Sequence, residues 1–354
     1  MKKILFILKE RHYGPKPSYG LINSASHVAE FLSHERFSCK VVTVVDSNAI
    51  DKEIHIFKPD VVILEALWCP TYKLKELIEI KRHKHIDWVV RIHSDIGFLS
   101  CESQALQLVN EYIDLHKHNL TIALNSYKFV KSLSEIMGHK FSYLPNVITL
   151  QNPGQDFRED RHHIDIGCFG AMRLLKNQCF QAICAMKAAD QLGKTLRFHI
   201  TPVVDERDPI STNLIELFKN NRHELIIHDW LPNDEFQDLV KEMDMGLQIS
   251  YTESFNIVSA DFINNNRLIV VSDAIDWLSP IMRASTTDYD TATNKIIYMY
   301  KHRNSEWLKD ISRHDLKEFN HVAKHEWLEF LNAGHNEHGF TEHHLGVRNP
   351  FRRR

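Results

Sequence analysis

Two cationic side chains three residues apart, Arg173 and Lys176, follow a predicted strand at residues 164–169. The spacing predicts that both lie at the opening of a helix, where unpaired backbone N–H groups already favour an anion. A guanidinium offers forked hydrogen bonds and an ammonium offers a point charge, so the pair is suited to binding a diphosphate. A solvated pair of cations at a helix start explains the same two residues equally well.

Two carboxylates, Glu253 and Asp261, are eight residues apart after another predicted strand at residues 245–249. Eight residues span just over two helical turns, so we expect both side chains on one face of a helix. Carboxylates in that position accept hydrogen bonds from the hydroxyls of a sugar and of a ribose. The spacing alone favours a plainer interpretation, in which an acid at a helix N-terminus is stabilised by the helix dipole and the aspartate lies on the surface.

These residues belong to the second of two series of alternating strands and helices. In the first series, predominantly apolar or β-branched segments predict buried strands of a parallel sheet at residues 4–8, 41–45, 61–64, 88–92 and 121–124. Helical spacing predicts helices over 21–32 and 99–115, and the polar residues 151–163 suit an interdomain linker. The second series predicts strands at 164–169, 196–200, 225–227, 245–249 and 268–271, with helices near 179–191, 213–220, 234–242 and 255–264.

The alternation predicts an α/β protein with two facing Rossmann-like domains and a C-terminal helical region. We expect an N-terminal, acceptor-side domain over residues 1–150 and a donor-side domain over 164–286. Helices over 287–335 are expected to pack back on the N-terminal domain, followed by a polar, basic tail over 336–354. Ligands of such sheets bind at the carboxyl ends of the strands, and the crevice between two units suits a nucleotide-bearing ligand.

Composition excludes several other classes of protein. The chain has 354 residues, of which 43% are hydrophobic and 25% charged, and a formal net charge of −3, a balance unlike that of disordered chains. The six cysteines form no C-x-x-C pair, so we expect a reducing compartment, the cytoplasm. No apolar segment approaches the ~20 residues of a membrane-spanning helix. The absence of G-x-G-x-x-G and G-x-x-x-x-G-K-S/T motifs argues against a dinucleotide dehydrogenase and a P-loop ATPase.

The order of the motifs resembles that of GT-B glycosyltransferases, in particular the retaining enzymes of family 4. The resemblance rests on Arg173-x-x-Lys176, His228-Asp-Trp-Leu-Pro, Glu253-Ser-Phe-Asn-Ile-Val-x-x-Asp261 and residues 268–273, and it spans most of 164–273. The family motif E-x7-E ends in Glu, whereas this chain has an aspartate, one methylene shorter. In the N-terminal half, residues 89–95 resemble the strand that delivers a histidine to the donor sugar, and the loop at 10–19 has one glycine where a pair is common.

The resemblance implies a role for each matching residue. Arg173 and Lys176 would hold the donor diphosphate and neutralise charge as the nucleotide leaves. Glu253 would bind hydroxyls of the transferred sugar, and Asp261 would accept hydrogen bonds from the ribose. His93 would contact the sugar, although a hydrogen-bonded core histidine is nearly as good an interpretation. The other expected donor-binding residues are Gly20, Gly170, Thr201, Trp230, Leu231, Asn256, Ile257 and Val258.

The activity implied is that of a retaining glycosyltransferase, which moves a sugar from a UDP- or GDP-type donor to a hydroxyl acceptor without a metal ion, another cofactor or a protein nucleophile. The acceptor, whether a saccharide, a lipid-linked molecule or a modified nucleobase, is left open. One alternative is a phage-type enzyme that modifies hydroxylated bases in DNA. It is supported only by a tail in which four of the residues 348–354 are arginines, a segment able to contact nucleic acid or a membrane surface. The other alternative is a non-catalytic relative that binds nucleotide sugars.

Overall fold

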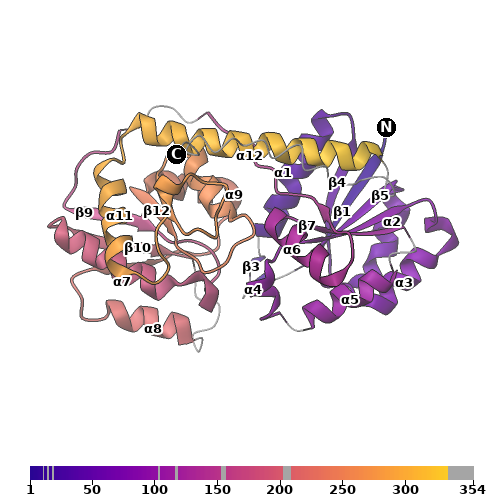
Figure 1. Cartoon of the computed structure of the whole chain (residues 1–354), viewed down its shortest axis with the longest axis horizontal. Coiled ribbons are helices and arrows are strands. Elements are labelled where there is room, and N and C mark those ends of the chain that lie inside the picture. The colour runs from indigo at the N-terminus through magenta and orange to yellow at the C-terminus, as the bar shows by residue number, and fades with distance from the viewer. Residues whose placement is uncertain are drawn as a thin grey trace.

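Two parallel β-sheets, each flanked by helices, form the framework of the chain (Figure 1). The computed structural model describes residues 1–10, 12–13, 16–17, 20–102, 104–115, 119–152, 157–201 and 209–333. The expected tail at 336–354 and much of the loop after the first strand lie outside these residues. The two sheets confirm the prediction of an α/β fold with two Rossmann-like units.

The first sheet contains β1 (Lys3–Lys9), β4 (Ser38–Val44), β5 (Val61–Glu65), β6 (Asp87–Ile92), β7 (Leu120–Leu124) and β8 (Ser142–Tyr143). Its strand order is β4-β1-β5-β6-β7-β8, and neighbouring strands are parallel. The surrounding helices are α1 (Gly20–His34), α2 (Ile50–Phe57), α3 (Thr71–Glu79), α4 (Ile96–Leu99), α5 (Ala105–Leu115) and α6 (Tyr127–Met137). A small antiparallel pair, β2 (His12–Tyr13) and β3 (Lys16–Pro17), follows β1.

The second sheet contains β9 (His163–Gly167), β10 (Thr195–Ile200), β11 (Glu224–Ile227), β12 (Met245–Gln248) and β13 (Ile269–Val271). Its strand order is β11-β10-β9-β12-β13, again with parallel neighbours. Its helices are α7 (Gln178–Gln191), α8 (Pro209–Phe218), α9 (Asn233–Glu242) and α10 (Ile257–Asn264), and α11 (Tyr289–Lys301) and α12 (Glu306–Ala333) follow.

Both faces of the first sheet are covered, which explains its continuous apolar strands. In β1, Leu5 and Ile7 belong to one core cluster, whereas Ile4, Phe6 and Leu8 belong to another on the opposite face. Side chains alternate between the two faces of a strand, so a strand buried on both faces needs apolar residues at every position.

The prediction of a single helix over residues 99–115 is wrong. The structure has the short helix α4 before it and α5 from Ala105, separated by a turn. Gln104 has a φ of 55°, in the left-handed region that a right-handed helix cannot include. This break matters because it leaves α4 as a separate turn of helix directly after β6.

The long helix α12 runs along both halves of the molecule (Figure 1). Near its end, Trp327 is fully buried and its indole N–H donates to the carbonyl of Pro145 at 2.8 Å. Its ring lies 6.1 Å from that of Phe6 in β1. Asn320, nearer the middle of the helix, bonds both the N–H and the carbonyl of Ile148 at 2.9 and 2.8 Å. The helix therefore ties the second half to the first.

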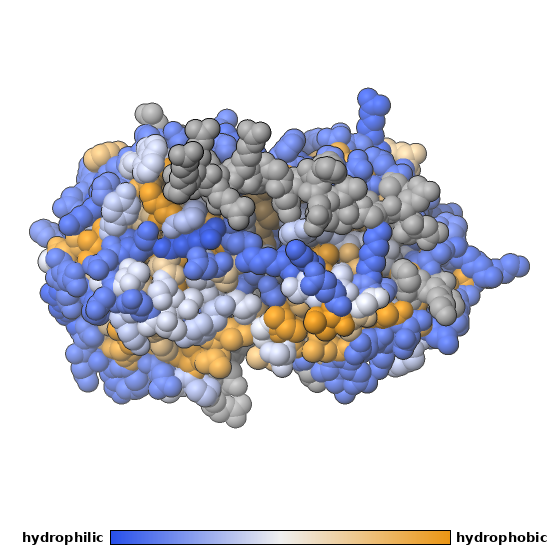
Figure 2. Space-filling view, viewed as in Figure 1, coloured by the Kyte–Doolittle hydropathy of each residue, from blue (hydrophilic) through white to orange (hydrophobic). Residues whose placement is uncertain are grey.

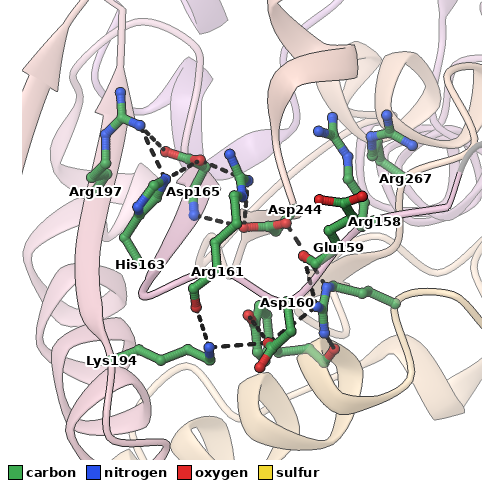
Figure 3. Close-up of polar contacts among 12 residues, drawn as sticks. Arg158, Glu159, Asp160, Arg161, His163, Asp165, Lys194, Arg197, Asp244 and Arg267 are labelled. Carbon is green, nitrogen blue, oxygen red and sulfur yellow. Dashed lines mark hydrogen bonds and ion pairs between the residues drawn. The ribbon is translucent and has the colours of Figure 1, made fainter.

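An ion network at the amino ends of the second sheet holds the segment that connects the two halves (Figure 3). Asp244 accepts a hydrogen bond from the N–H of Asp165 at 2.9 Å and pairs with Arg161 at 3.1 Å. Lys194 pairs with Asp160 at 3.0 Å. Because ligands of parallel sheets bind at the opposite, carboxyl ends of the strands, we interpret this network as structural.

The visible surface is mostly hydrophilic, with apolar residues gathered toward the lower centre of the view (Figure 2). The outline is indented there, between the two halves. Among the described helices, none is both long and apolar enough to cross a membrane.

Candidate functional site

A buried polar cluster at the carboxyl ends of the second sheet brings together three of the predicted residues. The Lys176 Nζ lies 2.5 Å from Glu253 Oε1. The same oxygen accepts a hydrogen bond from Asn256 Nδ2 at 2.9 Å, and this amide also donates to Gln248 Oε1 at 2.7 Å. Gln248 in turn donates to the carbonyl of Phe169, after β9, at 2.8 Å. The strand ends β9 and β12 thereby fix the position of the acid–cation pair.

Arg173 and Lys176 do not lie in the first turn of a helix as expected. Arg173 is extended, residues 174–176 form a 3₁₀ turn, and α7 begins only at Gln178. Asn177, with a φ of 59°, separates the turn from the helix. Arg173 and Lys176 therefore precede the first turn of α7. The positive end of a helix dipole acts mainly within that turn, which explains why cations are tolerated at these two positions.

Gly170 and Thr201 fix the loop that leads from β9 to these cations. The Thr201 hydroxyl donates to the carbonyl of Gly170 at 2.6 Å and accepts from its N–H at 3.1 Å. Gly170 has a φ of 110°, a conformation that side-chain-bearing residues rarely adopt. The glycine is therefore required by the backbone of the loop after β9. Residues 202–208, which follow Thr201, lie outside the described part of the chain.

Asp261 is nine-tenths buried on α10, where Gln237 Nε2 of α9 donates to its Oδ1 at 2.8 Å. Burial raises its pKa to about 7, although this hydrogen bond acts in the opposite direction. The expectation that Glu253 and Asp261 share one helix face is wrong. Asn256 caps α10 by accepting a hydrogen bond from the Ser259 N–H at 2.9 Å, so the helix begins at residue 257 and Glu253 lies in the loop before it.

Ile257 and Val258 are the first two residues of α10. Helix geometry leaves their N–H groups without an intrahelical partner. Their backbone is thus suited to the anion-binding role expected of them, which remains a prediction.

The two halves meet where α4 faces the loop before α10. The Ser254 hydroxyl donates to the carbonyl of His93 at 2.6 Å. A Cβ added to Gly97 would lie 2.7 Å from Thr252 Cγ2, which shows how closely the backbone of α4 approaches this loop. Lys128 of α6 pairs across the same junction with Asp276 at 3.1 Å. Gly20 opens α1, which also reaches the second half, since Asn23 Nδ2 donates to Asn233 Oδ1 at 3.2 Å.

His93 is held by a buried carboxylate that the sequence analysis missed. Its Nε2 is hydrogen-bonded to Glu65 Oε2, and Glu65 also pairs with Arg91 Nη1 at 3.2 Å. Burial raises the pKa of Glu65, but Arg91 and His93 together outweigh it and hold this pKa below its usual range. Arg91 Nη2 donates in addition to Asn146 Oδ1 at 2.6 Å. The sequence does contain a signal for this contact, since Glu65 and Arg91 each lie in a mainly apolar strand. Buried charges must be paired, so two such residues of opposite charge indicate an ion pair.

Trp230 and Leu231 follow β11 shortly after His228, whose ring stacks on that of His199 in β10. His228 Nε2 lies 2.8 Å from His199 Nδ1, and His199 Nε2 lies 3.0 Å from Asp165 Oδ1. Burial, together with His199, lowers the pKa of His228 to about 4, so its imidazole is neutral at pH 7. This chain of hydrogen bonds fixes the end of β11. The segment that we expect to face the base, with Trp230 and Leu231, begins there.

The described residues include no group of three or more His, Cys, Asp and Glu side chains arranged to hold a metal ion. Among the described residues that follow β9, Arg173 and Lys176 bring positive charge to the carboxyl ends of the second sheet. The arrangement offers two cations, one of them paired with a carboxylate, on the side of the second half that faces α4.

Comparison with solved structures identifies the fold. No family model matches the sequence, and a search of curated proteins returned no match either. The chain superposes on sucrose-phosphate synthase of Thermosynechococcus elongatus with a TM-score of 0.69 and 11% identity, over 94% of this chain and 98% of that one. HepE of Anabaena, solved with UDP and glucose, gives a TM-score of 0.65 and 12% identity, over 93% of this chain and 100% of that one.

TarM of S. aureus, in a variant solved with fondaparinux, alpha-GlcNAc-glycerol and UDP, gives a TM-score of 0.60 and 13% identity over 77% of this chain. The match covers 55% of that protein, so this chain spans about half the length of TarM. These neighbours are GT-B glycosyltransferases, and the chain has their fold, as the order of its motifs predicted.

Proposed function

We propose that the chain is a glycosyltransferase that transfers a sugar from a nucleotide-sugar donor to a hydroxyl acceptor. The observation that carries the proposal is the cluster at the carboxyl ends of the second sheet, where Lys176, Glu253 and Asn256 are in contact. A diphosphate needs cations and backbone amides, and a sugar needs a carboxylate that accepts from its hydroxyls. Both requirements are met on the side of this half that faces α4.

In this proposal the donor diphosphate binds between Arg173, Lys176 and the first amides of α10. Charge that develops on the leaving phosphate is neutralised by these groups, which are fixed before the reaction begins. Glu253 holds hydroxyls of the sugar, and Asp261 accepts from the ribose. The segment after β11, with Trp230, and the loop at Thr201 would line the base.

The reaction itself is proposed to proceed with retention and without a protein nucleophile. The acceptor oxygen forms a bond to the anomeric carbon on the face from which the phosphate departs, and the acceptor proton passes to the leaving phosphate oxygen. His93, oriented by Glu65, would contact the sugar from the N-terminal half. Donors of the UDP or GDP type are proposed, and the UDP type has the support that HepE and TarM were solved with UDP.

A thermal-shift panel of nucleosides, nucleoside diphosphates and their sugar conjugates tests the proposal. A ligand present at 100 times its Kd should stabilise the folded state by about 2.7 kcal/mol. We expect a diphosphate or its sugar conjugate to raise the unfolding midpoint and the matching nucleoside to do so much less. A panel in which no nucleotide shifts the midpoint would contradict the proposal.

Metal independence is tested separately, once a transferable donor is found. Treatment with a chelator should leave the transfer rate within about twofold of the untreated enzyme, because Arg173 and Lys176 would supply the charge that a metal ion otherwise supplies. A strict requirement for added metal would contradict this part of the proposal.

A further inference from the structure

The aromatic ring of Phe98 lies between the two cations of the second half and the body of the first. Phe98 belongs to α4 and is 8% exposed. The Arg173 guanidinium lies over its ring at 5.4 Å from the centroid, and the Lys176 ammonium at 5.6 Å. Both distances are within the ≈ 6 Å at which a ring attracts a cation through its π-face.

We propose that Phe98 is a positioning residue for the diphosphate of the donor, contributed by the N-terminal half to a site on the C-terminal half. This inference rests on the proposed function and deepens it. The ring orients both cations while competing for none of their hydrogen bonds to oxygen, because it offers no lone pair. Glu253 acts differently on Lys176, since its carboxylate is an acceptor that a phosphate oxygen must replace or share.

The position of Phe98 is itself fixed by the junction between the halves. Asp95 caps α4 by accepting from the Ile96 N–H at 2.6 Å. The neighbouring Gly97 is in close contact with Thr252, and the carbonyl of His93 accepts from Ser254. The ring therefore reaches the cations only when α4 sits against the loop before α10. Assembly of the anion site is in this way coupled to the approach of the two halves.

The test replaces the ring without emptying its place. Phe98→Leu keeps an apolar side chain but removes the π-face, and Phe98→Tyr keeps the ring. Ile96→Ala is the matched control, because it lies on the same helix with 46% of its surface exposed. Binding is measured by titration calorimetry with two series of probes, uridine, UMP and UDP, and guanosine, GMP and GDP.

Loss of two cation–π contacts should raise the Kd for the preferred diphosphate by roughly five- to thirtyfold in Phe98→Leu. The Kd of the corresponding nucleoside should change by less than about twofold, and Phe98→Tyr and Ile96→Ala should behave like the wild type. This selectivity for the diphosphate is a readout that a purely structural role would not produce.

Two results would overturn the inference while leaving the proposed function intact. One is a Kd for the diphosphate that Phe98→Leu leaves unchanged, and the other is an equal weakening of nucleoside and diphosphate. If the wild-type protein binds neither series, the proposed function fails and the inference fails with it.

Discussion

Replacing Asp261 with asparagine should stabilise the protein in a pH-dependent way. Burial raises the pKa of this carboxyl from 3.8 to about 7. Between these two values the folded protein retains a proton that the unfolded chain has lost, so stability falls as pH rises from about 4 to 7. Above pH 7 the folded protein carries a buried carboxylate, which the neutral amide of Asp261→Asn avoids.

The magnitude follows from the size of the shift. A displacement of about three pKa units corresponds to about 4 kcal/mol when the carboxylate is ionised in both states. About a third of this penalty is already present at pH 5, where the unfolded chain is ionised and the folded protein is not. The free energy of unfolding of Asp261→Asn, relative to that of the wild type, should therefore be about 2–3 kcal/mol larger at pH 8 than at pH 5.

Urea denaturation at pH 5 and pH 8 measures this difference. Asp238→Asn on α9 is the matched control, because its side chain is 76% exposed and its pair with Lys241 lies on the surface. Exposed pairs of this kind contribute about 0–1 kcal/mol. If Asp261→Asn and the wild type differ by the same free energy at both pH values, the reasoning from burial is wrong.

Asp261→Asn also tests the proposal that Asp261 accepts hydrogen bonds from the ribose of the donor. Ribose hydroxyls donate to a carboxylate and favour its ionised form, so the Kd of the wild type for UDP should fall as pH rises from 6 to 8. Asp261→Asn should bind UDP about 10–100-fold more weakly, the loss expected when hydrogen bonds to a charged group are removed. It should also show little dependence on pH. Unchanged UDP affinity would retire the ribose role and leave the stability argument standing.

Three further substitutions probe other parts of the account. Arg173→Ala should lower kcat/KM for sugar transfer by about 10²–10³ while moving the unfolding midpoint by less than ~2 °C, and a large loss of stability would instead make the residue structural. Gly170→Ala should cost about 1–3 kcal/mol in urea denaturation because of its left-handed φ of 110°. Gly20→Ala, with no atom within 4 Å of the added Cβ, is its control. Asp244→Ala should cost about 1–3 kcal/mol by leaving the buried N–H of Asp165 without its acceptor, and a loss below 1 kcal/mol would argue against the structural role of the network.

Apolar patterning was enough to locate most of the framework. The strands β1 and β5 consist mainly of consecutive apolar residues because both of their faces are buried, and this leaves a clear trace in the sequence. In β6 and β9 the apolar residues are interrupted by a buried charge, Arg91 and Asp165 respectively. Besides the short α4, three helices, α2, α3 and α6, were not predicted. Each buries only two or three side chains, for example Ile50 and Ile54 in α2, so their apolar periodicity is short.

The site was only partly accessible from the sequence. Residues on one segment, such as Arg173 and Lys176, could be paired by spacing, whereas contacts across the two halves could not. Phe98 looks like an ordinary core residue in the sequence, and only its position against the cations of the other half shows another use. The spacing of Glu253 and Asp261 suggests one helix, because spacing does not reveal that Asn256 is the cap and that the helix begins only at residue 257.

A crystal structure of the protein with bound UDP tests the central claim most directly. The account predicts that the diphosphate lies within hydrogen-bonding distance of both Arg173 and Lys176, with the first amides of α10 facing the distal phosphate and the ribose at Asp261. A diphosphate bound elsewhere, with Lys176 still paired to Glu253 and Arg173 turned away from the ligand, would contradict it.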